Sequence, residues 1–114
     1  MNKPWQPYAL HILDMIEKIH RIEARGSIVD DEILYDATLR NLQTLSEATQ
    51  QLPEDKKLQC TDIPWREISG FRNILVHNYL GDIDPLTIVR VVESYLPSLE
   101  TCIRKLLDLD KENI

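Results

Sequence analysis

The sequence predicts an all-α fold, an antiparallel bundle of four to five helices whose last helix bends at a proline. Three observations predict it. Apolar residues recur at spacings of three and four in several long segments, which is typical of amphipathic helices. The 114 residues include only three glycines and six prolines, too few for the turns of a β protein. No segment alternates valine, threonine and aromatic residues as strands do.

The first predicted helix covers residues 7–24, and Gly26 lies where a C-terminal cap is expected. Its apolar stripe has alternating spacings of four and three residues and consists of Tyr8, Ile12, Met15, Ile19 and Ile22. His11 and His20 lie off this stripe and are expected at the surface or at the edge of the core. The stripe predicts one buried face and one solvated face.

The second predicted helix starts with a capping sequence at residues 27–30 and runs to about Leu52, where Pro53 ends it. Its inward side chains are expected to be Ile33, Ala37, Leu42, Leu45, Ala48 and Leu52. Residues 53–63 are polar and are expected to form a loop or a short helical turn.

The third long helix is predicted over residues 65–80, with Trp65 as a core anchor and Gly81 as its stop. Asp84 and Pro85 then supply a capping residue and a proline at the first helical position. The last helix has an apolar seam of Val89, Val92, Leu96, Leu99, Ile103 and Leu106, a pattern that suits near-parallel packing. Pro97 lies within the seam and is expected to bend this helix.

Length and composition fit a single domain over residues 1–114. The net charge of −6 argues against a long positive track for nucleic acid, but it leaves room for a small site that works on one phosphate. The first residues lack the apolar core of a signal peptide, and no apolar run approaches the ~18 residues that span a membrane. We therefore expect a cytoplasmic protein that does not contact membranes. Cys60 and Cys102 form no CxxC pair and are expected to be two free thiols.

The segment RNILVHNY, residues 72–79, combines Arg72, Asn73, His77 and Tyr79 within one predicted helix. An ideal helix turns by ~100° per residue, so Arg72 and Tyr79 lie on one side while His77 points ~140° away from Arg72. Asn73 and His77 are four residues apart and can touch. One helix alone does not aim Arg72 and His77 at the same point. Either the arginine bends round, or a second copy of the helix completes the site.

These residue types suit phosphate chemistry. A guanidinium binds phosphate oxygens with two hydrogen bonds, and an imidazole that titrates near neutral pH passes protons. Asn73 can orient the imidazole of His77. RNA supplies its own nucleophile, the 2′-hydroxyl, so the reaction needs no metal, and the carboxylates and histidines lack the spacing of metal ligands. We expect neither a metal nor a cofactor. A bare R-x4-H pattern is also common on the solvated faces of unrelated helices.

The residues around the motif carry a resemblance to a known family. The segment IPWREISGFRNILVHNYLGDID, residues 63–84, resembles the signature of the HEPN-domain toxins of the HepT type, whose pattern is R-x4-H-x-Y. Arg72, His77 and Tyr79 match this pattern position by position. The segment LRNLQTLSEATQQL, residues 39–52, is similar to the second helix of the family, with Ser46 in place of the usual glycine. The segment YLPSLE, with Pro97, is similar to the bent last helix of the family.

The resemblance implies a HEPN-like homodimer in which two motif helices meet, so that Arg72 and His77 of both chains form one catalytic site supported by Asn73. It implies the toxin of a type VII toxin–antitoxin system, a metal-independent endoribonuclease that cuts RNA. It also implies a partner, a minimal nucleotidyltransferase antitoxin, which adenylylates Tyr79 and blocks the cleft.

Two other functions fit the same residues. The chain could be a non-catalytic nucleotide- or substrate-binding subunit of a nucleotidyltransferase complex, with Arg72 and His77 binding a nucleotide. It could also be a degenerate structural dimer. The intact Arg72 and His77 pair favours the ribonuclease, and Tyr79 favours regulation by adenylylation.

Overall fold

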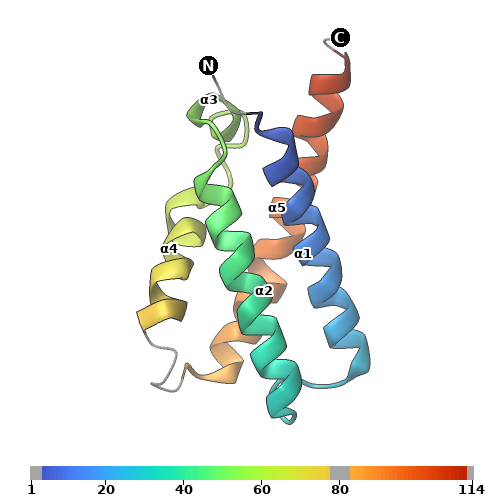
Figure 1. Ribbon diagram of the computed structural model, residues 1–114, viewed down its shortest axis with the longest axis vertical. Helices are drawn as coiled ribbons and strands as arrows, with labels where there is room; N and C mark the ends of the chain where they lie inside the picture. Colours follow the sequence, from blue (N-terminus) through green and yellow to red (C-terminus); the bar gives the residue numbers. More distant parts are fainter. Residues whose placement is uncertain (1–3, 78–82, 113–114) are drawn as a thin grey trace.

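Five helices and no strand make up the described part of the chain (Figure 1), which confirms the predicted all-α bundle. The computed structural model describes residues 4–77 and 83–112, with the backbone alone for residues 72, 74–77 and 109–112. The helices are α1 (Gln6–Arg25), α2 (Glu32–Gln50), α3 (Glu54–Lys57), α4 (Trp65–His77) and α5 (Pro85–Glu112).

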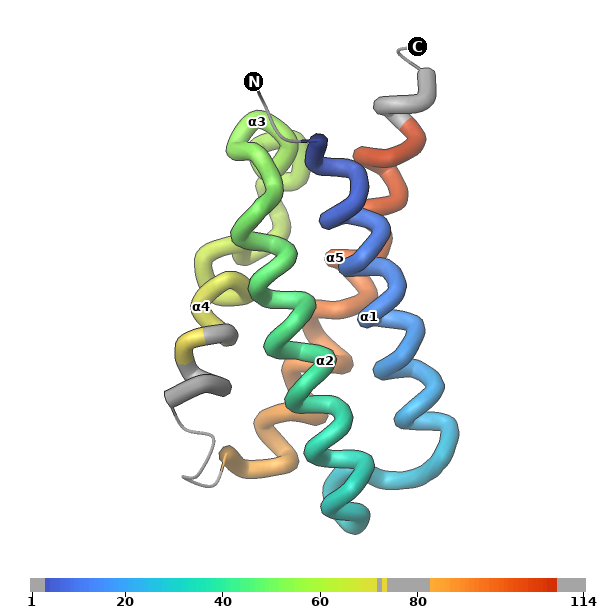
Figure 2. The backbone as a smooth tube through the Cα atoms, in the orientation of Figure 1, coloured from blue at the N-terminus to red at the C-terminus, as the bar shows by residue number. Residues whose placement is uncertain are grey.

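The long helices alternate in direction, and α2 lies between α1 and α4 in the view of Figure 2. Helix α2 packs on both α1 and α4, while α5 packs on α1. The short α3 lies at the end of the bundle where α1 begins (Figure 1). This arrangement gives α4 a supported side on α2 and leaves its remaining sides for other contacts.

The core forms where the predicted apolar stripes of α1 and α5 meet. Ile12, Met15 and Ile19 are buried as predicted, whereas Tyr8 and Ile22 at the ends of the stripe are only partly buried. The α5 seam is buried from Val92 to Leu106, with Val89 half-buried, and the buried Ile88 and Val91 widen it. Histidines 11 and 20 are exposed, as expected. Pro97 lies inside α5. Proline has no backbone N–H, so it cannot donate the usual helical hydrogen bond to the Glu93 carbonyl.

The start of α2 differs from the sequence prediction. Asp31, not the Ser27 segment, is the N-cap, and its carboxylate accepts the backbone N–H groups of Ile33 and Leu34 at 2.9 Å and 3.3 Å. Ile33 was expected to face the core but is 78% exposed. Ala37, one turn later and also expected inward, is half-buried. The buried residue is its neighbour Thr38, whose hydroxyl donates to the Leu34 carbonyl.

The prediction of two free thiols is wrong, because the structure joins Cys60 and Cys102 in a disulfide. The two residues are 42 positions apart in sequence and their Cα atoms are 6.2 Å apart, within the range that a disulfide spans. Cys60 precedes α4 and Cys102 lies in the second half of α5. Only the antiparallel return of the chain brings them together, so their spacing in sequence gave no sign of the pairing.

Breaking this link should lower stability, because a closed loop of this length restricts the unfolded chain. We expect Cys60→Ser to lose about 2–4 kcal/mol of unfolding free energy in oxidising buffer. Urea denaturation of the parent and the variant, with and without dithiothreitol, measures the loss. The difference should shrink under reduction, and a parent protein equally stable in both buffers would contradict the prediction.

Candidate functional site

Helix α4 carries three of the four predicted site residues. The backbones of Arg72, Asn73 and His77 all lie in α4, and the side chain of Asn73 is exposed. Tyr79 and the predicted end of this helix at Leu80 and Gly81 lie outside the described residues. Ile68 is buried and Phe71 is half-buried, so these two residues mark the core side of α4.

The start of α4 is fixed by Trp65. Its indole N–H donates to the carbonyls of Lys57 and Cys60, both at 3.0 Å. The ring is half-buried and packs against the core, so its predicted role as an anchor is confirmed. These bonds tie the loop before α4 to the first turn of the helix that carries the motif.

The middle of α4 is fixed by Ser69, which faces α2. Its hydroxyl forms a hydrogen bond with the Thr49 hydroxyl at 3.1 Å, and its carbonyl accepts the Gln50 side-chain amide at 2.9 Å. Thr49 is fully buried, and its hydroxyl is satisfied by the Ser46 carbonyl at 2.6 Å together with the Ser69 hydroxyl. The two hydrogen bonds of Ser69 fix both the position of α4 along its axis and its rotation relative to α2.

The chain that leads into α5 is fixed by α2 as well. The Tyr35 hydroxyl donates to the carbonyl of Ile83. Asp84 then accepts the Leu86 backbone N–H at 3.0 Å, and Pro85 is the first residue of α5, which confirms the predicted start of the last helix. The motif is thus held between two anchored points of the fold.

Helical geometry separates the two predicted catalytic residues. Arg72 and His77 are five residues apart in α4, which corresponds to a rise of ~7.5 Å and a rotation of ~140° on an ideal helix. Asn73 lies one turn from His77 and on the same side. An ideal helix therefore puts Asn73 and His77 on one side and Arg72 on another.

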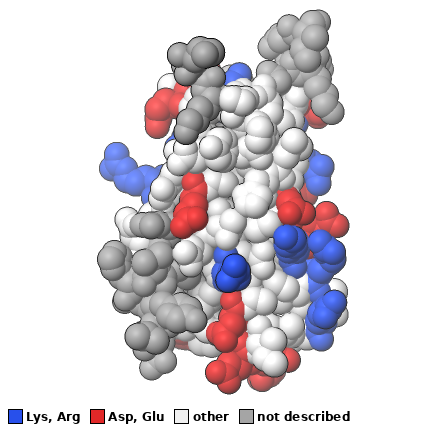
Figure 3. All heavy atoms as spheres, in the orientation of Figure 1, with Lys and Arg blue, Asp and Glu red and all other residues white. Residues whose placement is uncertain are grey.

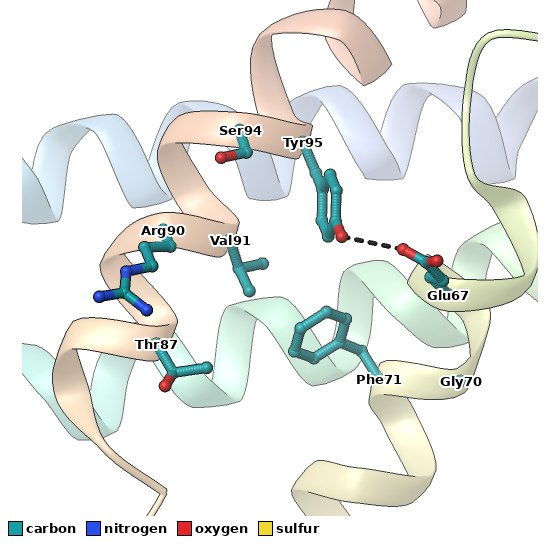
Figure 4. Close-up of a pocket in the computed structure, with 8 residues that line it drawn as sticks. All are labelled: Glu67, Gly70, Phe71, Thr87, Arg90, Val91, Ser94 and Tyr95. Carbon is teal, nitrogen blue, oxygen red and sulfur yellow. Dashed lines mark hydrogen bonds between the residues drawn. The ribbon is translucent and has the colours of Figure 1, made fainter.

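A groove of about 440 Å³ opens between α4 and α5 beside the motif (Figure 4). Helix α5 contributes residues at helical spacing, and α4 contributes one turn. The lining residues are Glu67, Gly70, Phe71, Thr87, Arg90, Val91, Ser94 and Tyr95. Its floor is largely apolar, and Figure 4 shows the guanidinium of Arg90 directed away from Glu67.

One hydrogen bond crosses this groove. The Tyr95 hydroxyl donates to Glu67 Oε2 at 2.9 Å and links α5 to α4. This bond, the negative charge of Glu67 and residual burial all raise the pKa of Tyr95 above its usual 10.0. Tyr95 therefore stays protonated near neutral pH and remains the donor.

The surface charges are mixed. On the face shown in Figure 3, basic and acidic side chains lie next to one another. Within the described ranges, no three His, Cys, Asp or Glu residues are grouped to hold a metal ion. In the same residues, none of the helices combines the length and apolarity that crossing a membrane requires.

Sequence comparisons define the family of this chain. The profile of the family described as "Ribonuclease HepT-like" matches residues 9–106, which include all of the described motif. The chain belongs to the HepT-like ribonuclease family. The family resemblance inferred from the sequence is therefore confirmed.

Relatives over nearly the full length support this membership. The chain is 31% identical over 110 residues to "Putative RNase TTE0752" of Caldanaerobacter subterraneus subsp. tengcongensis, covering 93% of this chain and 96% of the relative. It is 32% identical over 111 residues to "Probable ribonuclease HepT" of Thermococcus cleftensis, covering 93% of this chain and 98% of the relative. No solved structure was found to match.

The α5 side of the groove was missed at the level of sequence. Thr87, Arg90, Val91 and Ser94 recur at spacings of three, one and three, so they lie on one face of α5. That spacing could have indicated, from the sequence alone, that these residues share one face of the last helix. It did not show that this face lies opposite α4, which depends on how both helices pack on the rest of the bundle.

The bond between Tyr95 and Glu67 predicts a loss of stability in alkali. Since the folded pKa of Tyr95 is raised above 10.0, the contribution of the protonated tyrosine is complete below that pH. Above that pH, Tyr95 of the unfolded chain ionises before Tyr95 of the folded chain, so the stabilising contribution decreases. The contribution is lost as pH rises through the pKa of Tyr95 in the folded state. Urea denaturation followed by circular dichroism from about pH 8 to about pH 11 should show a steeper loss for the parent than for Tyr95→Phe.

Glu67→Gln is the matched control, because it keeps an acceptor and removes the charge. It should flatten the alkaline loss of stability in the same direction as Tyr95→Phe. Identical pH profiles for the parent and both variants would show that the bond does not form in solution.

Proposed function

We propose that this member of the HepT-like family is the toxin of a type VII toxin–antitoxin system and cleaves RNA as a metal-independent endoribonuclease in the cytoplasm. The observation that carries the proposal is the R-x4-H-x-Y motif of Arg72, His77 and Tyr79 in a chain that matches this family over residues 9–106. The names of the relatives as ribonucleases support it.

The proposed reaction uses the 2′-hydroxyl of the RNA. One imidazole accepts the 2′ proton while the 2′-oxygen forms a bond to phosphorus. The bond from phosphorus to the 5′-oxygen breaks, and that oxygen receives a proton from a second imidazolium. The products are a 2′,3′-cyclic phosphate and a free 5′-hydroxyl. The guanidinium of Arg72 stabilises the charge on the non-bridging oxygens in the transition state.

A homodimer supplies what one α4 lacks. Because Arg72 and His77 leave the helix ~140° apart, two copies of α4 facing each other would bring an arginine and two imidazoles to one phosphate. Asn73 would orient His77 from one turn away. The net charge of −6 is compatible with this arrangement, since at physiological salt charges farther than ~8 Å are largely screened.

Removal of either group should stop the reaction. We expect His77→Ala and Arg72→Ala each to lower RNA cleavage and cellular toxicity by ~10²–10⁴-fold, because a proton-transfer group or a phosphate-binding cation is lost. His20→Ala removes an exposed imidazole from α1 and should have no effect. Activity should persist in EDTA. A His77→Ala variant that cuts RNA at the parental rate would favour the nucleotide-binding subunit instead.

Mixing the parent with His77→Ala tests the composite site. A heterodimer of the two holds one His77, whereas the proposed reaction uses two imidazoles, one from each chain. Cleavage after subunit exchange should therefore fall with the square of the parental fraction, and a fall in direct proportion to that fraction contradicts a shared site. A monomer by light scattering that still cleaves RNA contradicts it.

Regulation is proposed to act through Tyr79. The cognate nucleotidyltransferase, with ATP and magnesium, would transfer AMP to the Tyr79 hydroxyl and place a phosphate and a nucleoside two residues from His77. The added charge would compete with RNA for Arg72. Tyr79→Phe should keep nearly full activity and escape silencing. Intact mass decides the matter: the parent should gain one AMP and Tyr79→Phe none, and an equal gain on both would exclude this mechanism.

A further inference from the structure

The groove between α4 and α5 has no role in the reaction described above. It has a volume of about 440 Å³, within the range of small-ligand sites and large enough for one nucleotide. Gly70 lines it from α4 and precedes His77 by seven residues, which places the two on the same side of an ideal helix, ~10.5 Å apart along its axis. An occupant of the groove therefore lies along the side of α4 on which an ideal helix also places His77.

Gly70 indicates that the occupant comes from outside the described chain. It lies inside α4 and lines the groove, and a Cβ built on it would meet no atom of the described residues within 4 Å. Glycine in a helix interior is less favourable than alanine, so the packing of the fold does not explain this residue. Close approach of another molecule to the backbone does explain it.

The chemistry of the lining matches a nucleotide. The rings of Phe71 and Tyr95 offer aromatic faces, on which bases of single-stranded RNA stack. The exposed Arg90 lies at the other side of the groove from Glu67 (Figure 4) and offers a guanidinium to a phosphate. Ser94 and Thr87 add hydroxyl groups beside Arg90, which can bond ribose or phosphate oxygens.

The charges favour RNA over a second copy of this chain as the occupant of the groove. An apolar helix face laid into the groove would take the Arg90 guanidinium out of water without a counter-charge, which is costly. An RNA strand that places a base in the groove also carries a phosphate on the same nucleotide, and this phosphate supplies the counter-charge for Arg90. The carboxylate of Glu67 repels that phosphate, but it is bound to Tyr95 at the opposite side from Arg90.

We propose that this groove is a subsite for one nucleotide of the RNA next to the cleaved bond, with the base on Phe71 and a backbone phosphate on Arg90. This subsite rests on the proposed ribonuclease function and extends it. A strand held by its neighbouring nucleotide would enter the motif in a fixed register. Cleavage would then prefer single-stranded segments, where a base is free to leave its stack.

The test uses a short RNA with 2′-O-methyl riboses, which lacks the nucleophile and stays intact. Fluorescence anisotropy with the full chain should give a Kd roughly tenfold higher for Arg90→Gln and for Phe71→Leu than for the parent, because one phosphate contact or one stacked base is weakened. Arg90→Gln should also lower the slope of log Kd against log salt by about 0.7, a change that a purely structural role would not produce. With cleavable RNA, KM should rise more than kcat falls.

Two further variants complete the test. Arg21→Gln removes an exposed cation from α1 and should leave the Kd within about twofold of the parent and the salt slope unchanged. Gly70→Ala should raise the thermal stability of the chain, since alanine favours a helix, and yet weaken RNA binding. This opposite pair of effects keeps the proposal testable even if Phe71→Leu fails to fold.

The outcomes separate the subsite from the function on which it rests. A parent that binds and cleaves RNA, with Arg90→Gln and Gly70→Ala indistinguishable from it, overturns the subsite alone. A parent that neither binds nor cleaves RNA overturns the ribonuclease proposal and the subsite with it. If light scattering shows that Arg90→Gln and Gly70→Ala dissociate a dimer, a second copy occupies the groove and the subsite is overturned.

Discussion

The attachment of α4 to α2 is the constraint on which the candidate site depends. Ser69 is bound through its hydroxyl to Thr49 and through its carbonyl to Gln50, so α4 can neither slide nor turn without breaking both bonds. A shift of one residue would rotate every side chain of α4 by ~100°. The direction of the motif and the lining of the groove are therefore set together, by the polar contacts between α4 and α2.

Much of the fold could be predicted from local sequence patterns. The seam of α5 and its start at Asp84 and Pro85 are visible because periodicity and capping act over a few residues. The wrong predictions for α2 arise because such patterns consider only neighbouring residues. Ile33 fits the apolar period but lies in the first turn, where Asp31 sets the start of the helix and no neighbour covers it. Thr38 is buried because a backbone carbonyl satisfies its hydroxyl, and hydropathy does not register that.

The candidate site could be predicted only in part, for a geometric reason. Arg72 and His77 belong to one short motif, so their identity and relative direction follow from the helix itself. The groove joins Phe71 to Arg90 across two helices, and the bond from Tyr95 to Glu67 spans 28 positions. Such contacts depend on the distance and tilt between α4 and α5, which no pattern within either helix determines.

The disulfide also defines a covalent unit. Cys60 and Cys102 enclose residues 61–101 in one closed loop, and this loop contains the whole motif and every residue of the groove. If a protease cuts the oxidised protein once anywhere in this loop, the disulfide still joins the two pieces covalently. In reduced protein the same cut releases two fragments. For a cut between α4 and Cys102, the redox state of this cysteine pair thus decides whether the motif helix stays covalently linked to the second half of α5.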